Sequence, residues 1–159
     1  MLSDTHAPRR WQRCPSAVAD RLRGVEAILH AGDVCTAEVL DELSAFAPVY
    51  AVLGNNDGPD VAAWGASPRW QHELGGVTIA MIHDSGVARG RAARLRRLFP
   101  HAALVIFGHS HIPLDETHDG QRIFNPGSPT DRRRQPRGTI GELVIEHGTV
   151  VSAQVIGLT

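Results

Sequence analysis

Seven residues that can bind metal ions are spread through the chain, each in a short polar motif. They are Asp4, His6, Asp33, Asn55, His83, His109 and His111. A mixture of carboxylate, amide and imidazole ligands suits Mn, Fe, Zn or Co better than Ca, because Ca prefers oxygen ligands alone. So many ligands predict two ions rather than one. Asp33 is the natural bridge, since one carboxylate can neutralise both ions.

Most of these motifs directly follow a run of apolar residues. The runs are 25–31 before Asp33, 49–53 before Asn55, 77–82 before His83, and 104–107 before His109 and His111. The carboxyl ends of neighbouring strands meet at one edge of a sheet, so motifs far apart in sequence can build one site. The spacing therefore predicts a single metal centre assembled from five segments.

Each motif also has an ordinary structural explanation when it is taken alone. Asp4 and His6 could belong to a loop or a cap, and Asp33 could cap the helix that follows it. The segment 54–57 could be a simple turn, because Asn, Asp and Gly tolerate unusual backbone angles. The histidines around Ser110 could lie in a solvated turn, and His83 could be a hydrogen-bonded strand-end histidine. Five such motifs at five strand ends favour the shared site.

The composition is that of an ordinary globular protein. The chain has 159 residues, enough for one domain with a core, and 42% of them are hydrophobic. Its net charge of −1 argues neither for nor against a nucleic-acid partner. No apolar run approaches the roughly 20 residues that span a bilayer, and no signal segment opens the chain. Two cysteines, Cys14 and Cys35, are too few for a disulfide scaffold and lack zinc-site spacing, so we expect reduced thiols in a cytoplasmic protein. We also expect no membrane partner.

Apolar runs alternate with helix-like stretches, which predicts an α/β domain covering residues 1–159. We expect helices at 15–22, 36–45 and 88–99, the second with Thr36 as its N-cap. Besides the runs that precede the metal-binding motifs, we expect strands at 70–74, 141–146 and 150–156 and a hairpin over 113–124. The expected hairpin turns are Gly75-Gly76, Asp119-Gly120 and His147-Gly148. Segment 57–68 is predicted as a loop, being rich in Gly, Pro and Ala.

With all its motifs in this order, the chain resembles the calcineurin-like metallophosphoesterases, and most of all their small bacterial and archaeal phosphodiesterases. The matching motifs are Asp4-x-His6, Gly32-Asp33, Gly54-Asn55-x-Asp57, His83, Gly108-His109-x-His111 and Asn125-Pro126-Gly127-Ser128. The resemblance covers essentially the whole chain. It implies an α/β (α+β) fold, a four-layer sandwich of two mixed β-sheets flanked by helices.

The resemblance also implies two divalent metal ions and the residues that hold them. The first ion would be bound by Asp4, His6, Asp33 and His111, and the second by Asp33, Asn55, His83 and His109. Manganese is the ion most associated with these small enzymes, although Fe, Zn, Co or Ni would also fit. A hydroxide shared by the ions would attack the phosphorus of a small phosphoester, most of all a diester, without a covalent intermediate. Asp33, Asn55 and His83 would be the catalytic ligands, with Asp57 in support.

The chain departs from the family pattern at two places. Many larger relatives carry a histidine, thought to protonate the leaving group, where this chain has Asn56. An amide is a poor general acid, and general acid catalysis contributes about 10²–10⁴-fold. We therefore expect weak activity on esters with poor leaving groups. In addition, only three residues precede Asp4, whereas a strand usually has about 5–6 residues. A truncated first strand would loosen Asp4 and His6.

Two other functions compete with a phosphodiesterase. One is a noncatalytic scaffold, because the metallophosphoesterase-like subunit of retromer uses this fold as an interaction platform. The other is a nuclease, which we rank lower because the chain shows no long basic groove and no added recognition domain. An anion-binding role is open for Arg132, Arg133, Arg134 and Arg137, although solubility or a subunit contact explains them as well. By resemblance, the protein would form a homodimer or homotetramer.

Overall fold

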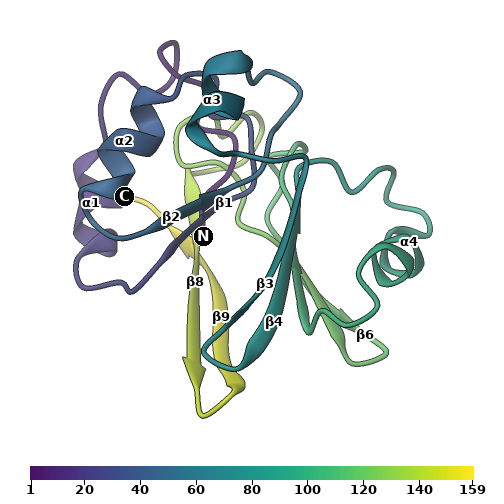
Figure 1. Ribbon diagram of the computed structural model, residues 1–159. Coiled ribbons are helices and arrows are strands. Elements are labelled where there is room, and N and C mark those ends of the chain that lie inside the picture. The colour runs from purple at the N-terminus through teal and green to yellow at the C-terminus, as the bar shows by residue number, and fades with distance from the viewer.

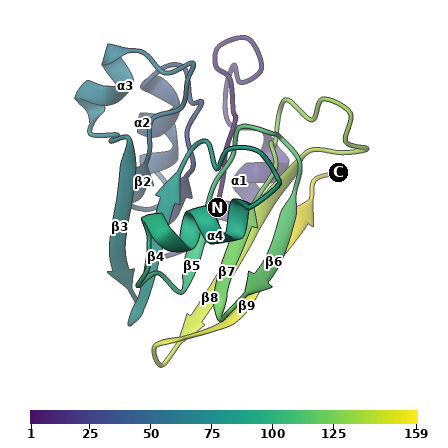
Figure 2. The ribbon, with the colours of Figure 1, turned by 90° about the vertical axis from the view of Figure 1, so that its right-hand side faces the viewer.

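The computed structural model describes all residues 1–159 as four layers, with helices outside and sheets inside (Figures 1 and 2). The helices are α1 (Ser16–Leu22), α2 (Glu38–Ser44), α3 (Pro59–Trp64) and α4 (Arg91–Leu98). The strands are β1 (Ile28–His30), β2 (Val49–Ala51), β3 (Arg69–Leu74), β4 (Val77–Ile82), β5 (Leu104–Ile106), β6 (Leu114–His118), β7 (Gln121–Asn125), β8 (Thr139–Glu146) and β9 (Thr149–Gly157). This arrangement confirms the predicted sandwich of sheets flanked by helices.

The start of the chain links strands of the first sheet layer. β1 and β2 pair in parallel, and Leu2 forms a parallel bridge with His30. The Met1 amino group donates to Gly141 O at 2.7 Å, and Gly141 N–H donates back to Met1 O at 2.8 Å. The antiparallel β8–β9 hairpin is thereby joined to β1 and β2. A cavity of about 590 Å³ lies beside this junction, lined in part by residues 21–29 and 140–145.

The second sheet has the strand order β3-β4-β5-β7-β6. β4, β5 and β7 are parallel to one another, and antiparallel hairpins add β3 and β6 at the edges. Each hairpin turn has two consecutive residues with positive φ, as a type I′ turn requires. These pairs are Gly75-Gly76, Asp119-Gly120 and, in the first layer, His147-Gly148. All three predicted hairpin turns are confirmed.

Three apolar clusters fill the three spaces between the four layers. One contains Leu40 and Leu43 of α2 together with Ile28. The second, between the sheets, contains Leu29, Ile79 and Phe124, and the third joins Leu95 of α4 to Val105. Burying each such side chain stabilises the fold by roughly 1.5–3 kcal/mol. Because β5 is buried on both faces, it appears in the sequence as an unbroken apolar run, whereas the equally buried β1 ends in the polar His30.

The prediction of a loop at 57–68 is wrong, because residues Pro59–Trp64 form α3. Proline at the first helical position and Asp60 in the first turn both favour a helix start. Val61 is fully buried and anchors the helix to the core. The glycines and the proline that indicated a loop lie at the two ends of this short helix instead, at Gly58, Pro59 and Gly65.

The predicted ends of several elements are also wrong. Thr36 is not an N-cap, because α2 begins after Ala37, whose N–H donates to Asp60 Oδ2 at 3.0 Å. β1 begins only at Ile28, since the segment 25–27 faces the cavity beside the chain start rather than a partner strand. α4 begins at Arg91 because Gly90 has a left-handed backbone. None of the four helices combines the length and apolar character needed to cross a bilayer.

Candidate metal centre

All seven predicted ligand residues lie at one edge of the sandwich, where parallel strands end. Asp4 and His6 follow the segment that pairs with β1, Asp33 follows β1, Asn55 follows β2, His83 follows β4, and His109 and His111 follow β5. The residues form a connected set of side chains, graded from buried to exposed. Asp4 and Asp33 are 0% and 2% exposed, whereas Asn55 and His109 are open to solvent. The centre therefore has a closed floor and an open side.

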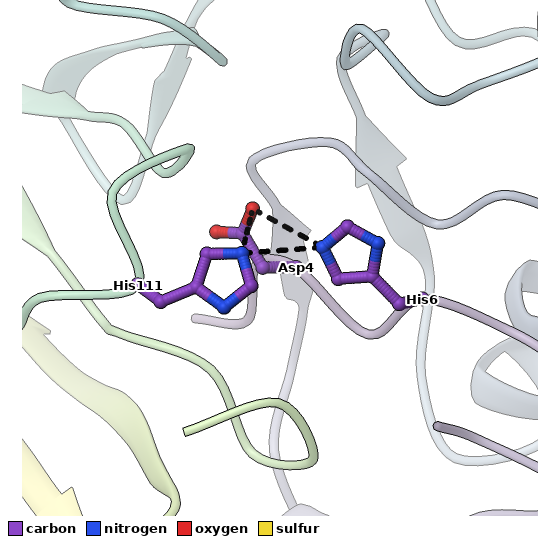
Figure 3. A group of neighbouring side chains, drawn as sticks. All are labelled: Asp4, His6 and His111. Atoms are coloured by element: carbon purple, nitrogen blue, oxygen red, sulfur yellow. Dashed lines mark hydrogen bonds and ion pairs between the residues drawn. The ribbon is translucent and has the colours of Figure 1, made fainter. Parts of the chain in front are cut away.

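Asp4, His6 and His111 form the first group of ligands (Figure 3). His111 Nε2 lies 3.3 Å from Asp4 Oδ1, and His6 Nε2 lies 3.8 Å from the same oxygen. The two Nε2 atoms are 3.2 Å apart. Asp4 Oδ2 accepts hydrogen bonds from Ser3 Oγ at 2.7 Å and from His109 N–H at 3.1 Å. Asp4 is therefore fixed through one oxygen and presents the other to the histidines.

Asp33, His83, Asn55 and His109 form the second group. His83 Nε2 lies 3.5 Å from Asp33 Oδ2 and 3.1 Å from Asn55 Oδ1, and His109 Nδ1 lies 2.9 Å from the same amide oxygen. Asp33 Oδ2 is also 3.6 Å from His6 Nε2 in the first group. A single oxygen of Asp33 thus faces histidines from both groups.

Backbone carbonyls fix the tautomers of two of these histidines. His83 Nδ1 lies 2.7 Å from Ala31 O, and His111 Nδ1 lies 2.5 Å from Asp131 O. A carbonyl only accepts, so each Nδ1 must carry the proton and donate it. In the neutral ring, Nε2 is then a lone pair pointing at the aspartates. Metal-binding histidines commonly have this arrangement, with the second nitrogen held by a carbonyl or carboxylate.

The aspartates are held in their charged form. Burial alone would raise the pKa of the Asp4 carboxyl, but the neighbouring His111, His6 and Ser3 outweigh it and hold that pKa well below its usual range. Burial opposes the charge of Asp33 as well, yet His83 and Asn56 lower its pKa to about 2. The pair therefore supplies two negative charges at neutral pH.

The aspartates have the opposite effect on the buried histidines. Burial would lower the pKa of His83, but Asp33 and then Asp4 raise it above its ordinary value. The pKa of His111 is raised in the same way, with burial opposed by Asp4 and the Asp131 carbonyl. The raised pKa values show that the aspartates favour a positive charge at each of these rings. A cation bound between the rings and the aspartates would supply that charge in place of a proton.

A buried oxygen that has no hydrogen-bond partner indicates that these residues can hold a divalent cation. Asp4 Oδ1 is buried and receives no hydrogen bond. An unpaired buried acceptor costs about 1–3 kcal/mol, so such an atom persists where another partner compensates for it. The neighbouring lone pairs of His6 and His111 provide no donor to that oxygen in their metal-ready tautomers. A cation between these atoms would satisfy all three, and mixed nitrogen and oxygen ligands suit a transition metal.

Five of the seven ligand residues have a left-handed backbone, an unusual conformation for residues other than glycine. They are Asp4 (φ 56°), His6 (φ 50°), Asp33 (φ 56°), His109 (φ 66°) and His111 (φ 58°). Such residues cost on the order of 1–3 kcal/mol each and persist where the surrounding structure enforces them. Backbone bonds between the motifs supply that enforcement, as in Asp4 N–H to Gly32 O at 2.9 Å and His6 N–H to Asp33 O at 3.1 Å.

Asn56 and Asp57, predicted as a weak acid and a supporting residue, both contact the Asp33 segment. Asn56 donates to the Asp33 carboxylate twice, from its backbone N–H at 2.8 Å and from Nδ2 at 2.7 Å. Asp57 accepts the backbone N–H groups of Asp33, Cys35 and Gly54 at 3.0, 2.6 and 2.7 Å. Asp57 thus ties the loop after β1 to the loop after β2, and Asn56 orients Asp33.

Several residues that position the centre were not singled out from the sequence as site residues. Ser128 Oγ donates to Asp4 O at 2.7 Å, and Asn125 Nδ2 donates to Gly108 O at 2.9 Å. The Asn125-to-Ser128 motif was the available signal for both. Ser3 contacts Asp4 directly and gave only the weak signal of a hydroxyl beside a ligand. Asp131 acts through its backbone carbonyl, which every residue type has, so the sequence carried no signal for it.

The chain is similar to proteins of one known family. The family model described as "calcineurin-like phosphoesterase superfamily domain" matches residues 1–148. A probable metallophosphoesterase from Methanothermobacter thermautotrophicus is 39% identical over 134 residues, covering 82% of this chain and 76% of that protein. The matched region of the family model includes all seven ligand residues.

Two solved structures share the fold across nearly their whole length. Vps29 from Entamoeba histolytica, solved as a D62A mutant, has a TM-score of 0.77 at 23% identity, covering 99% of this chain and 97% of that one. A structure described as a novel archaeal phosphodiesterase has a TM-score of 0.76 at 23% identity, with the same coverage. At this level of identity both similarities show the fold alone.

Proposed function

Because this chain belongs to the calcineurin-like phosphoesterase superfamily, we propose that it is a phosphodiesterase that uses two divalent cations, with manganese as the first candidate. The observation that carries the proposal is the position of Asp33. One of its oxygens faces histidines of both ligand groups, at 3.6 and 3.5 Å. A carboxylate shared in this way is what a two-ion centre requires and a one-ion centre does not.

The chain's own residues would divide the work as follows. Asp4, His6 and His111 would hold one ion, and Asn55, His83 and His109 the other, with Asp33 shared. When bound, such a pair of cations makes water a nucleophile near neutral pH and offsets charge on the phosphate oxygens. Asn55 and His109 are exposed, so the substrate would approach from their side.

Asn56 bears on which esters react fastest. Its amide donates to Asp33 and is not a proton donor for a leaving group. The chain therefore supplies no general acid at this position, and esters whose leaving group departs as a stable anion should react best. Cleavage of a diester rather than a monoester is supported by the archaeal phosphodiesterase of the same fold.

The test is hydrolysis of bis-p-nitrophenyl phosphate by metal-stripped protein, with and without added Mn²⁺. We expect turnover that depends on Mn²⁺ and is lost in Asp33→Asn. Asp20→Asn is the matched control, because Asp20 is an exposed partner of Arg23 on the α1 surface. Turnover that survives Asp33→Asn, or that needs no metal, would contradict the proposal.

A noncatalytic scaffold is the second candidate, because the fold that this chain shares with Vps29 does not by itself imply catalysis. The same protein samples separate the two functions when metal content is measured beside activity. Bound metal with no turnover of any phosphodiester would favour the scaffold. Turnover lost only in Asp33→Asn would favour the enzyme.

A further inference from the structure

Two arginine-rich segments that are far apart in sequence lie against each other in the fold. Residues 7–14 contain Arg9, Arg10 and Arg13, and residues 129–138 contain Arg132, Arg133, Arg134 and Arg137. Arg10 Nε lies 3.8 Å from Asp131 Oδ1, and Thr130 Oγ1 donates to Thr5 O at 2.8 Å. All seven arginines are exposed. We call these two segments the arginine rim.

The arginine rim concentrates positive charge in a protein that is otherwise acidic. Its eighteen residues include seven arginines and one aspartate, a formal charge of +6, whereas the whole chain carries −1. The rest of the molecule therefore carries −7. Salt bridges elsewhere on the surface, such as Arg122 with Asp115 at 2.7 Å, show how this chain neutralises an arginine. Within the rim, Arg10 alone has a carboxylate within 4.0 Å.

No carboxylate accepts a hydrogen bond from an arginine of the rim. Glu42 accepts Trp11 Nε1–H at 2.7 Å and Cys14 N–H at 2.6 Å through its two oxygens. Asp131 lies 3.8 Å from both Arg10 and His111 Nδ1, beyond hydrogen-bond distance. Arg132 Nη1 donates to Gln135 O at 2.6 Å. The other guanidinium groups of the rim, and the free N–H groups of Arg132, are available to an external anion.

The rim is attached directly to the ligands of the metal centre. Its first segment begins at the residue after His6. Its second segment supplies the Asp131 carbonyl that holds His111 Nδ1 at 2.5 Å, and it follows Ser128, which bonds to Asp4 O. A substrate at the metal centre would therefore have the arginine rim beside it.

We propose that the arginine rim binds phosphates that flank the cleaved diester of a single-stranded nucleic acid. This inference rests on the proposed phosphodiesterase function and names its substrate class. A diester at the centre with further phosphates beside it is the repeating chemistry of a polynucleotide backbone. Arginine suits it, because guanidinium groups bind phosphate in a bidentate manner.

The flexibility of the ligand favours a single strand over a duplex. A single strand can bend so that one phosphate meets the exposed side of the centre while its neighbours meet the rim, whereas a duplex is stiff over this length. Trp11, the one aromatic residue of the rim, is 3% exposed and offers no surface for base stacking. Recognition would then be of the backbone, with little preference for base sequence. The sequence left an anion-binding role open for the arginines of the second segment. It did not indicate that residues 7–14 join them, because the two segments meet only in the folded chain.

The experiment measures binding of a fluorescent phosphorothioate oligothymidylate to the full chain, which keeps the backbone charge and resists hydrolysis. The rim variant is Arg133→Gln/Arg134→Gln. The control is Arg21→Gln/Arg97→Gln, which makes the same charge change at exposed arginines of α1 and α4. We expect at least about tenfold weaker binding in the rim variant. The slope of log affinity against log salt should fall by roughly 0.7 for each lost phosphate contact, and the control should match the parent protein.

Three outcomes would overturn the inference. They are equal loss in the two variants, tighter binding of a duplex than of the single strand, and binding of vesicles rich in phosphatidylserine in preference to the oligonucleotide. The binding assay does not depend on turnover. If the small diester is not hydrolysed but the oligonucleotide binds through the rim, the enzyme proposal fails and the rim remains as a nucleic-acid site.

Discussion

Asn56 makes a specific prediction because its side chain contacts the carboxylate at the centre of the site. Its Nδ2 lies 2.7 Å from Asp33 Oδ2. In Asn56→His, a group with a pKa near neutrality would stand beside the reacting phosphate. We expect kcat/KM on a diester with an alkyl leaving group to rise by up to about 10²-fold, while hydrolysis of the bis-p-nitrophenyl ester, whose leaving group needs no acid, gains nothing.

The comparison of the two substrates is the control for this prediction. Asn56→Ala removes the bond to Asp33 without adding an acid, so it should slow both esters by similar factors. If Asn56→His gave no gain on the alkyl diester, leaving-group protonation would not be the step that this position limits.

His30 gives a prediction about stability in acid. It is fully buried, and burial lowers its pKa to about 3 from an ordinary 6.5. The unfolded chain therefore binds a proton there between pH 6.5 and 3 that the folded chain excludes. Stability should be complete above pH 6.5 and should fall as the pH drops through that window. In His30→Gln this loss should be smaller, as measured by urea unfolding at pH 7 and pH 4.

The raised pKa values of His83 and His111 act in the opposite sense, because protonation of those rings favours the folded state. They are present in both proteins, so the difference between the parent and His30→Gln isolates His30. Parallel pH profiles for the two proteins would show that His30 does not set acid stability.

At the scale of elements, the sequence predicted best where one pattern decides the structure. Hairpins with Gly75-Gly76 or Asp119-Gly120 were predictable, because only a few residue pairs tolerate two left-handed positions. The positions of Asp33, Asn55, His83 and the two-histidine motif at strand ends were predictable because a run of mostly apolar residues precedes each of them. α3 was missed because its six residues are too few for a helical period, and its burial through Val61 is a tertiary effect.

The glycine before the two-histidine motif gives a prediction at this scale. At Gly108 an added Cβ would overlap Ser3 Oγ and lie 2.7 Å from Asp4 Oδ2. Gly108→Ala should therefore push apart the segments that carry Asp4 and His109. We expect Mn²⁺ affinity, measured by calorimetry, to fall by about 10–100-fold, the effect of disturbing groups that support a metal ligand.

Removing the obstructing hydroxyl provides the matched test. The double variant Ser3→Ala/Gly108→Ala relieves the closest overlap and should recover part of the lost affinity. If Gly108→Ala bound Mn²⁺ as tightly as the parent protein, close packing of these two segments would not be needed for the centre.

At the scale of the whole molecule, the order of motifs predicted the architecture, whereas the connections between segments came only from the fold. The four layers and the gathering of strand ends follow from alternating runs along the chain. The contacts of residues 129–138 with Thr5 and Arg10 do not, because they join loops without periodicity. The carbonyl partners of His83 and His111 were also beyond sequence, since any residue can supply a carbonyl.

Metal binding should stabilise the entire fold, because the ligands come from five segments of both sheets. A ligand at 100 times its Kd adds about 2.7 kcal/mol of stability. For a chain of this size, that corresponds to a rise in Tm of roughly 5–10 °C. Scanning calorimetry with Mn²⁺ and then with EDTA should show the rise and its reversal. An unchanged Tm in the presence of tightly bound metal would mean that the ligands do not join these segments.

The central claim is that seven residues form one centre for two ions that share Asp33. The most direct measurement is the number of Mn²⁺ ions bound per chain after equilibrium dialysis, combined with the electron paramagnetic resonance spectrum of the same sample. We predict two ions per chain and the spectrum of a spin-coupled pair. A single ion per chain, or two ions with uncoupled spectra, would contradict the shared centre.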